Sequence, residues 1–223
     1  MIEIEFNRVL PKHYQLHVGR LQMGPINETG FRMQDADIDY QARLLGTAQV
    51  RFVVLAQTNA SFFVPRYDED VAKRIEDASG APATTCGRLT ALACKALGAS
   101  RVAFLSPYSA ELNEMGRRYY EGVHGLQVAA VESYGVAATS GAVNAMKPEV
   151  CTAALERADR AEVEAFIIAG GALPTMHMID GWERRFGKPV VTTNQVAMWA
   201  IFGALGGGET LPGYGRLLGE RKH

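Results

Sequence analysis

The sequence has little of what marks a nucleic-acid-binding, membrane-spanning or secreted protein. Its 223 residues carry 23 Lys and Arg against 24 Asp and Glu without a block of like charges, so neither nucleic acid nor an anionic membrane is indicated as a partner. No apolar run approaches the roughly 20 residues that span a bilayer, and the opening MIEIEFNRVL lacks the basic start and apolar centre of a signal peptide. We therefore expect a soluble, cytoplasmic protein.

Cysteine and histidine are also scarce. The three cysteines, Cys86, Cys94 and Cys151, lack the paired spacing of a metal site, and the five histidines are scattered. Each thiol is expected to be buried and reduced, because a free Cys usually behaves as a small hydrophobic residue. For Cys86 an alternative stays open, since TTCGRL places it at a strand-to-helix turn where a helix N-terminus can lower the pKa of its thiol. His177 is expected to face solvent or neighbouring helices.

Short apolar runs alternate with amphipathic segments, which is the pattern of βα units around a parallel sheet. With 48% hydrophobic residues, the chain can bury the core of one large domain or two small ones. The predicted strands are residues 16–23, 50–56, 81–85, 101–106, 126–134, 164–170 and 188–193. The predicted helices are residues 35–48, 68–79, 86–98, 109–122, 147–160, 175–186 and 195–205.

A coarse internal duplication relates two parts of the chain. RFVVLAQTNASFF, a helix, GAPATT and a second helix are echoed by AFIIAGGALPT, a helix, GKPVVTTNQ and a further helix. Ligands of parallel α/β sheets bind outside the carboxyl ends of strands, so Gln57, Thr58 and Asn59 can meet Gly170 and Gly171 at one cleft. The spacing alone leaves the alternative that the polar residues cap a helix and the glycines allow a tight turn.

Five stretches carry a family resemblance when they are taken together. They are EFNRVLP, AQTNASF, LSPYSAELNE, GGALPT with RRFGKPVVTTNQVAMWA, and LPGYGRLL. In this order and at these separations, the sequence resembles the maleate isomerase and arylmalonate decarboxylase group of the aspartate/glutamate racemase superfamily. The resemblance implies an α/β fold of two pseudo-symmetric Rossmann-like lobes, each with a parallel four-stranded sheet, around a cleft. The first lobe would comprise residues 1–98 and 206–223, and the second residues 99–205.

The resemblance also implies a chemistry and its partners. A small carboxylic or dicarboxylic acid would lie between the lobes of a homodimeric enzyme that uses no metal, flavin, nicotinamide or pyridoxal phosphate. Members can carry a cysteine in each lobe, whose thiolate abstracts a proton, attacks an alkene or returns a proton to an enolate. Here those two positions carry Gln57 and Gly170, with Ala169 beside the second. Racemisation by two thiols is therefore disfavoured, and so is thiolate addition unless Cys86 serves.

The positions that the resemblance assigns to the substrate's carboxylate are better preserved. Thr58 matches a residue whose hydroxyl and amide bind the carboxylate, and Asn59 supplies an amide donor where serine is common. Tyr108 in SPY matches a tyrosine that reaches the carboxylate or enediolate, and Asn113 matches the asparagine that follows it. The amides of residues 170–171, at the start of a predicted helix, would add donors. Residues 193–195 fit either this site or a plain helix N-cap.

A second departure from the family concerns the first strand. Members usually begin with a glycine-rich strand and a polar loop ahead of an EFNRVLP-like segment, whereas this chain opens almost at that segment. We expect either a misplaced start or a rearranged first lobe. A lobe that lacks its central strand would expose two apolar strand edges.

Two functions follow from these observations. The first is a cofactor-independent isomerase or decarboxylase-type enzyme that acts on a small acid through an enolate-like intermediate. Tyr108 and the two cysteine-equivalent positions, Gln57 and Gly170, would lie at its catalytic centre. The alternative is a catalytically silent relative that binds small carboxylates.

Overall fold

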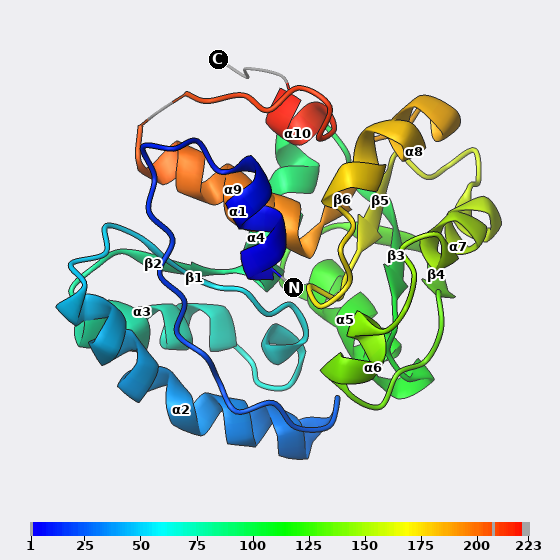
Figure 1. Cartoon of the computed structure of the whole chain (residues 1–223). Coiled ribbons are helices and arrows are strands. Elements are labelled where there is room, and N and C mark those ends of the chain that lie inside the picture. The colour runs from blue at the N-terminus through cyan, green and yellow to red at the C-terminus, as the bar shows by residue number, and fades with distance from the viewer. Residues whose placement is uncertain (1, 207, 220–223) are drawn as a thin grey trace.

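Two parallel sheets of different size organise the chain (Figure 1). The structure is a computed structural model, and it describes residues 2–206 and 208–219. The first sheet pairs β1 (Val53–Leu55) with β2 (Ala83–Thr85). The second has the order β4-β3-β5-β6 and consists of β3 (Arg101–Ser106), β4 (Gln127–Ser133), β5 (Ala165–Ile168) and β6 (Val190–Thr192). The four-stranded sheet predicted for each lobe is thus correct for the second lobe and wrong for the first, whose sheet has two strands within the described residues.

Helices cover both sheets, as expected for parallel strands whose two faces must both be buried (Figure 1). They are α1 (Ile2–Val9), α2 (Glu28–Thr47), α3 (Tyr67–Ser79), α4 (Cys86–Ala96), α5 (Ala110–Gly122), α6 (Ser140–Asn144), α7 (Val150–Ala158), α8 (Ile179–Phe186), α9 (Thr193–Ala204) and α10 (Arg216–Gly219), with short 3-10 helices η1 (Asn59–Phe62) and η2 (Met176–Met178). Of the helices described, none is long and apolar enough to cross a bilayer.

The N-terminal segment is the part that the sequence predicted least well. Residues 16–23 were expected to form a strand, but they pair with none of the described strands and run as an irregular extended segment past α2. Their backbone is held instead by a side chain, because Asp37 of α2 accepts a hydrogen bond from Gln22 N. Helix α2 begins at Glu28 rather than at residue 35, since Asn27 caps it by accepting from Gly30 N.

The internal duplication is confirmed, with one difference that shapes the molecule. β1 and β2 form a parallel pair in the first lobe, and β5 and β6 form the equivalent pair in the second. The second lobe covers the other edge of β5 with β3. Within the described residues, no strand covers the corresponding edge of β1. Among those residues, one edge of the first sheet is thus unpaired where the equivalent edge of the second is paired.

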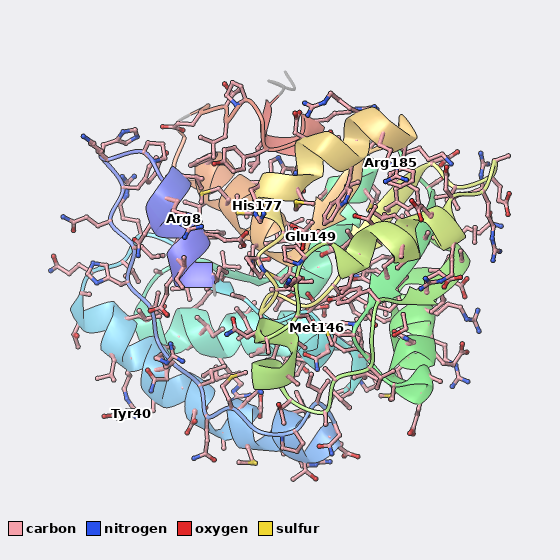
Figure 2. All side chains as sticks on the ribbon, turned by 45° about the vertical axis from the view of Figure 1, so that its right-hand side comes forward. Arg8, Tyr40, Met146, Glu149, His177 and Arg185 are labelled. Carbon is pink, nitrogen blue, oxygen red and sulfur yellow. The ribbon has the colours of Figure 1, made fainter. Side chains whose placement is uncertain are left out.

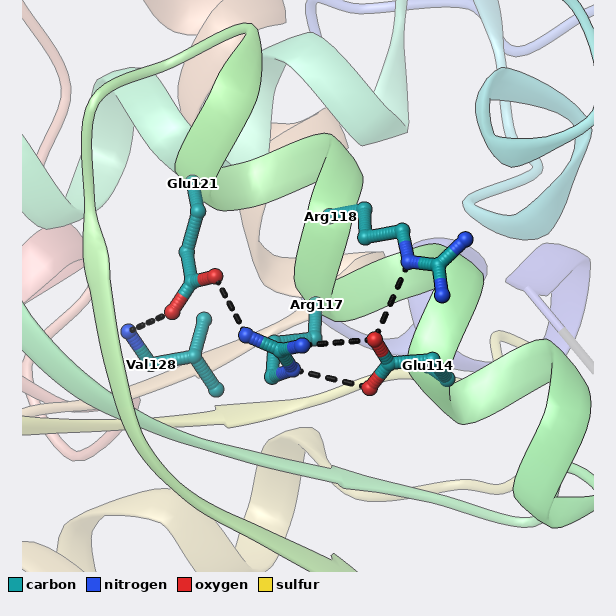
Figure 3. Close-up of polar contacts among 5 residues, drawn as sticks. All are labelled: Glu114, Arg117, Arg118, Glu121 and Val128. Carbon is teal, nitrogen blue, oxygen red and sulfur yellow. Dashed lines mark hydrogen bonds and ion pairs between the residues drawn. The ribbon is translucent and has the colours of Figure 1, made fainter.

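The second sheet forms the rigid centre of the molecule. Phe104 on β3 and Ile167 on β5 are fully buried in the core that also includes residues of α4 and α9. On its outer side, α5 is tied to β4 by Glu121, which accepts from Arg117 Nη1 and from Val128 N (Figure 3). The loops after β3 and β5 therefore start from well-fixed positions.

The lobes meet through buried polar contacts as well as through apolar packing. Thr58 Oγ1, just after β1, lies 2.9 Å from Thr193 Oγ1, at the start of α9, and both residues are buried. Helix α9 also packs against α4 and α1. Residues at the carboxyl end of the first sheet are thus held against those at the carboxyl end of the second.

Candidate active site

A cavity of about 360 Å³ is lined by residues that follow three of the strands. Residues 57–59 after β1, 107–108 after β3 and 170–172 after β5 all line it. The strands run parallel, so their carboxyl ends reach the same side of the fold, which is where α/β sheets bind ligands. The structure therefore brings together six of the seven residues that the sequence singled out, and the seventh, Asn113, lies behind them.

Tyr108 is one of the residues that line this cavity. The residue is buried at the cavity wall, and its Oη has no hydrogen-bond partner among the described residues. Burial raises the pKa of Tyr108 above its ordinary value, so the phenol stays protonated near neutral pH. A protonated, unpaired hydroxyl at a cavity wall is a donor available to an anionic ligand.

Asn113 supports Tyr108 rather than facing the cavity. Its Oδ1 accepts from Ser106 Oγ, and its Nδ2 donates to Tyr108 O at 3.3 Å. Ser106 Oγ in turn accepts from Tyr108 N at 3.0 Å. This closed set of hydrogen bonds fixes the turn between β3 and α5, so the geometry gives Asn113 a positioning role.

Gly170 and Gly171 form a turn with two free donors. The predicted helix does not start there, because η2 begins at Met176 and α8 at Ile179, while the turn itself closes through Leu173 N donating to Gly170 O at 3.0 Å. Neither glycine N–H has a hydrogen-bond partner in the described parts of the chain. Successive free amides of this kind bind anions without a helix behind them.

The same turn has no room for a side chain. Gly170 has a φ of +109°, and a β-carbon there would collide with Tyr134 Oη, which donates to Ala169 O. At Gly171 a β-carbon would lie 2.9 Å from Asn194 Oδ1. The position that the resemblance assigns to a second-lobe cysteine therefore has a backbone geometry that suits glycine alone.

On the first-lobe wall, the three polar residues have different surroundings. Gln57 Nε2 donates to Gln34 Oε1 on α2, so its amide is already paired. The Thr58 hydroxyl is hydrogen-bonded to the Thr193 hydroxyl. The side chain of Asn59 has no hydrogen bond to other described residues and lines the cavity. Asn59 is thus the freest side-chain donor on this wall.

The thiols lie elsewhere. Cys86, Cys94 and Cys151 are all free and fully buried, and none lines the cavity. Burial raises the pKa of Cys94 and Cys151 to about 12, and burial together with the nearby Asp68 raises that of Cys86 further. The Cys86 thiol contacts Thr193 O at 3.5 Å. The idea that a helix N-terminus acidifies Cys86 is therefore wrong, because loss of hydration outweighs the helix.

Glu5 is a component of the site region that the sequence did not reveal. This buried carboxylate on α1 accepts from Asn194 Nδ2 at 2.5 Å and from Met176 N at 2.8 Å, and burial raises its pKa. Asn194 Nδ2 also donates to Gly171 O at 3.1 Å. Glu5, which lies in EFNRVLP, thus connects α1 to Met176 directly and to Gly171 through Asn194. Its partners lie 171 and 189 residues away along the chain, so no local pattern could have indicated them.

Two histidines differ in their position relative to the cavity, since His17 is among its lining residues and His177 is not. His177 is exposed, as predicted; it lies in η2, close to α1 (Figure 2). The described lining contains no Asp or Glu, while His17 and Arg20 stand at its edge, so the cavity suits an anion. No group of three potential metal ligands occurs among the residues described.

Comparison with known proteins places this arrangement in a family. A family model described as arylmalonate decarboxylase matches residues 5–218. The chain belongs to this family. An arylmalonate decarboxylase from Bordetella bronchiseptica is 28% identical over 209 residues, which cover 90% of this chain and 84% of that protein. A maleate isomerase from Nocardia farcinica is 31% identical over 125 residues, which cover 56% of this chain and 49% of that protein.

Solved structures of similar proteins agree with the fold. A crystal structure of the maleate isomerase Iso from Pseudomonas putida S16 superposes with a TM-score of 0.91 at 24% identity, covering 99% of this chain and 94% of that one. A liganded double mutant of arylmalonate decarboxylase gives a TM-score of 0.80 at 26% identity, with coverages of 89% and 85%. The two-lobed α/β architecture expected from the sequence is thereby confirmed.

Proposed function

We propose that this member of the arylmalonate decarboxylase family is a cofactor-independent enzyme that decarboxylates a small malonate-type acid. The observation that carries the proposal is the set of unpaired donors around one cavity that lacks a thiol. These are Tyr108 Oη, the Asn59 amide and the two glycine amides of the 170–171 turn. They come from three loops that are fixed by the strands before them.

The donors favour charge that develops on a carboxylate. When the bond between the α-carbon and the leaving carboxyl group breaks, carbon dioxide departs and its bonding electrons remain on the α-carbon. These electrons delocalise onto the retained carboxylate as an enediolate, whose two oxygens accept hydrogen bonds from the donors. One such preorganised donor contributes about 3 kcal/mol to transition-state stabilisation in comparable anion holes. A proton from water then completes the α-carbon.

Reactions that require a thiolate at the cavity are less well supported. Isomerisation by addition to a double bond and racemisation by two thiols both need a nucleophile or base that touches the substrate. Among the described lining residues there is no cysteine, and Gln57 is neither an acid nor a base near neutral pH. Decarboxylation requires only an anion hole and a proton source.

The test is a panel assay. The protein is incubated with arylmalonates, alkylmalonates, maleate and the enantiomers of aspartate and glutamate, and carbon dioxide release, isomerisation and α-deuterium exchange are followed. We expect release from a malonate, and a loss of about 10²–10³ in kcat for Tyr108→Phe. Tyr40→Phe is the matched control, because Tyr40 points outward from α2 (Figure 2).

Three outcomes would count against the proposal. Turnover that is abolished by Cys86→Ala would restore thiol chemistry, and turnover confined to maleate would replace decarboxylation by isomerisation. Binding of malonates without release or exchange would indicate a binding protein.

A further inference from the structure

Tyr134 is a buried tyrosine whose hydroxyl reaches the glycine turn of the candidate site. It directly follows β4 and is 6% exposed, within the apolar cluster that includes Phe166 and Ile168 of β5. Its Oη donates a hydrogen bond to Ala169 O, the carbonyl group immediately before Gly170. Tyr134 itself is not among the described residues that line the cavity. Its influence on the site must therefore pass through the backbone that it holds.

The place of Tyr134 in the sheet explains why a long side chain is needed there. Because β3 lies between β4 and β5, the ends of β4 and β5 are two strand spacings apart, which is about 10 Å (Figure 1). The tyrosine side chain bridges this distance. The backbone of the same segment is tied to the loop after β3, since Tyr134 N donates to Ser106 O at 3.2 Å. Ala137 N likewise donates to Pro107 O at 2.9 Å. One segment thus connects the loops that follow β3 and β5.

The hydrogen bond to Ala169 fixes the direction of the next N–H group. Ala169 O and Gly170 N belong to one planar peptide unit, and the described chain contains no cis peptide bond. In a trans peptide unit the C=O and N–H groups point in opposite directions. With its C=O turned toward the buried Tyr134 hydroxyl, this unit directs the Gly170 N–H away from Tyr134. That N–H is unpaired among the described residues, and Gly170 lines the cavity.

The two free amides of the turn have different supports. The Gly171 N–H shares its peptide unit with Gly170 O, which accepts from Leu173 N at 3.0 Å, so the backbone itself holds this donor. The Gly170 N–H depends instead on a side chain, that of Tyr134. Burial raises the pKa of Tyr134, so its hydroxyl stays protonated and keeps donating near neutral pH. A substitution at Tyr134 therefore tests one of the two amides by itself.

We infer that Tyr134 is a positioning residue for the anion site: by holding Ala169 O, it orients the Gly170 N–H toward the carboxylate of the ligand. The inference rests on the proposed function for the chemistry of that ligand. It does not require turnover, because the orientation of the amide matters for binding a carboxylate as well as for stabilising an enediolate.

The sequence offers a single-site probe of this peptide unit. Ala169–Gly170 is the only alanine–glycine pair in the 223 residues. Alanine labelled with ¹³C at its carbonyl group and glycine labelled with ¹⁵N therefore give one peak in a carbonyl-to-amide correlation spectrum. The ligand is propionate, which is the product expected from methylmalonate and cannot lose carbon dioxide. In the parent, propionate should move the Gly170 amide proton downfield, and the Ala169 carbonyl resonance should move with it, because both groups belong to one polarised unit.

Tyr134→Phe removes the hydroxyl and keeps the ring. We expect the Ala169 carbonyl resonance to move upfield, the affinity for propionate to fall about tenfold, and kcat for methylmalonate to fall by a similar factor. Tyr67→Phe is the matched control, since buried Tyr67 also donates through its hydroxyl, at 2.8 Å to Asp35 Oδ1 on α2. It should lose stability as well, but keep the parental affinity and the parental Ala169 resonance.

Three results would overturn the inference. An unchanged Ala169 carbonyl resonance in Tyr134→Phe would show that the hydrogen bond is not formed in solution. Parental affinity in that variant would show that the hydrogen bond does not orient the donor. Should Tyr134→Phe fail to fold, the parent decides, because a Gly170 amide that does not respond to saturating propionate takes no part in anion binding.

The same measurements distinguish this inference from the proposed function. Propionate binding that depends on Tyr134, without carbon dioxide release from any malonate, would retain the positioning role and remove the enzyme. Carbon dioxide release with the same kcat in the parent and in Tyr134→Phe would retain the enzyme and remove the positioning role.

Discussion

Gly170 illustrates how one residue can fix what a site is able to do. The family resemblance places a thiol here, yet a positive φ and the Tyr134 hydroxyl leave no space for a β-carbon. The chain therefore has not merely exchanged a side chain at this position. The Tyr134 hydroxyl occupies the space that a β-carbon at residue 170 would need.

We predict that restoring the cysteine destabilises the protein. Gly170→Cys should lower the free energy of unfolding by about 1–3 kcal/mol from backbone strain alone, and by more from the collision with Tyr134. Urea unfolding measures this loss. Gly122→Ala, at the end of α5, should cost little, because no atom lies within 4 Å of its added methyl group. If the collision matters, adding Tyr134→Phe to Gly170→Cys should recover part of the loss; full stability of the single variant would contradict the prediction.

Glu5 should make stability depend on pH. Burial raises its pKa in the folded protein, so between its unfolded and folded pKa values the folded state binds more protons than the unfolded state. Its contribution is therefore most favourable at or below the unfolded value of 4.5, and is lost as pH rises through the raised pKa. Stability of the parent relative to Glu5→Gln should fall between about pH 4 and neutrality.

Urea unfolding across this pH range provides the measurement. Glu3→Gln serves as the control, since Glu3 lies on the same helix, is partly exposed and pairs with Arg20 at the surface. The stability of Glu3→Gln should depend on pH in the same way as that of the parent. Parallel curves for the parent and Glu5→Gln would show that Glu5 does not titrate differently on folding.

At the scale of elements, adjacent residues at the start of α9 have different roles: two cap the helix, and the others form hydrogen bonds to distant elements. Thr192 and Gln195 form a capping box, with Gln195 N donating to Thr192 Oγ1 at 3.4 Å and Thr192 N donating to Gln195 Oε1. The Thr193 side chain is hydrogen-bonded to Thr58, and the Asn194 side chain donates to Glu5. Gln195 thus belongs to the helix cap, whereas Thr193 and Asn194 contact Thr58 and Glu5, and none of the three is among the residues that line the cavity.

We predict that removing the cap weakens α9 without disturbing the cavity. Thr192→Ala should lower the free energy of unfolding by about 1 kcal/mol, which is typical for a lost N-cap. Thr192→Ser retains the oxygen and should restore most of this. Chemical denaturation compares the three proteins, and calorimetry with the best malonate should show equal affinity. An equal loss for both substitutions would mean that the methyl group, rather than the cap, is what matters.

Elements with strong local signals were predictable, and those held by distant partners were not. β3 matches its predicted span of 101–106, because a buried apolar run follows the helix-ending Gly98. Residues 16–23 intersperse apolar and polar side chains as a strand does, but strand formation needs a neighbour, and no strand in the described part of the chain pairs with them. The short helix α1 carries no cap signal and is stabilised by packing, notably through buried Phe6.

At the scale of the whole molecule, the candidate site also has parts that the sequence predicts and parts that depend on distant contacts. Residues 57–59 and 170–171 could be placed at one cleft because parallel strands deliver their carboxyl ends to one side. The pairing of Gln57 with Gln34 and the hydrogen bonds of Glu5 both depend on tertiary contacts between separate elements. The bounds of the two lobes stay a prediction.

At this largest scale, the Thr58–Thr193 hydrogen bond should couple the two lobes energetically. Both hydroxyls are buried, so removing one leaves the other unpaired, at a cost of about 1–3 kcal/mol, whereas removing both costs less than the sum. A cycle of Thr58→Val, Thr193→Val and the double variant should thus give a coupling energy of about 1 kcal/mol by urea unfolding. Thr152→Val, on α7 and bonded to Trp182 instead, should be additive with Thr58→Val. Additivity in the first cycle as well would show that this hydrogen bond does not couple the lobes.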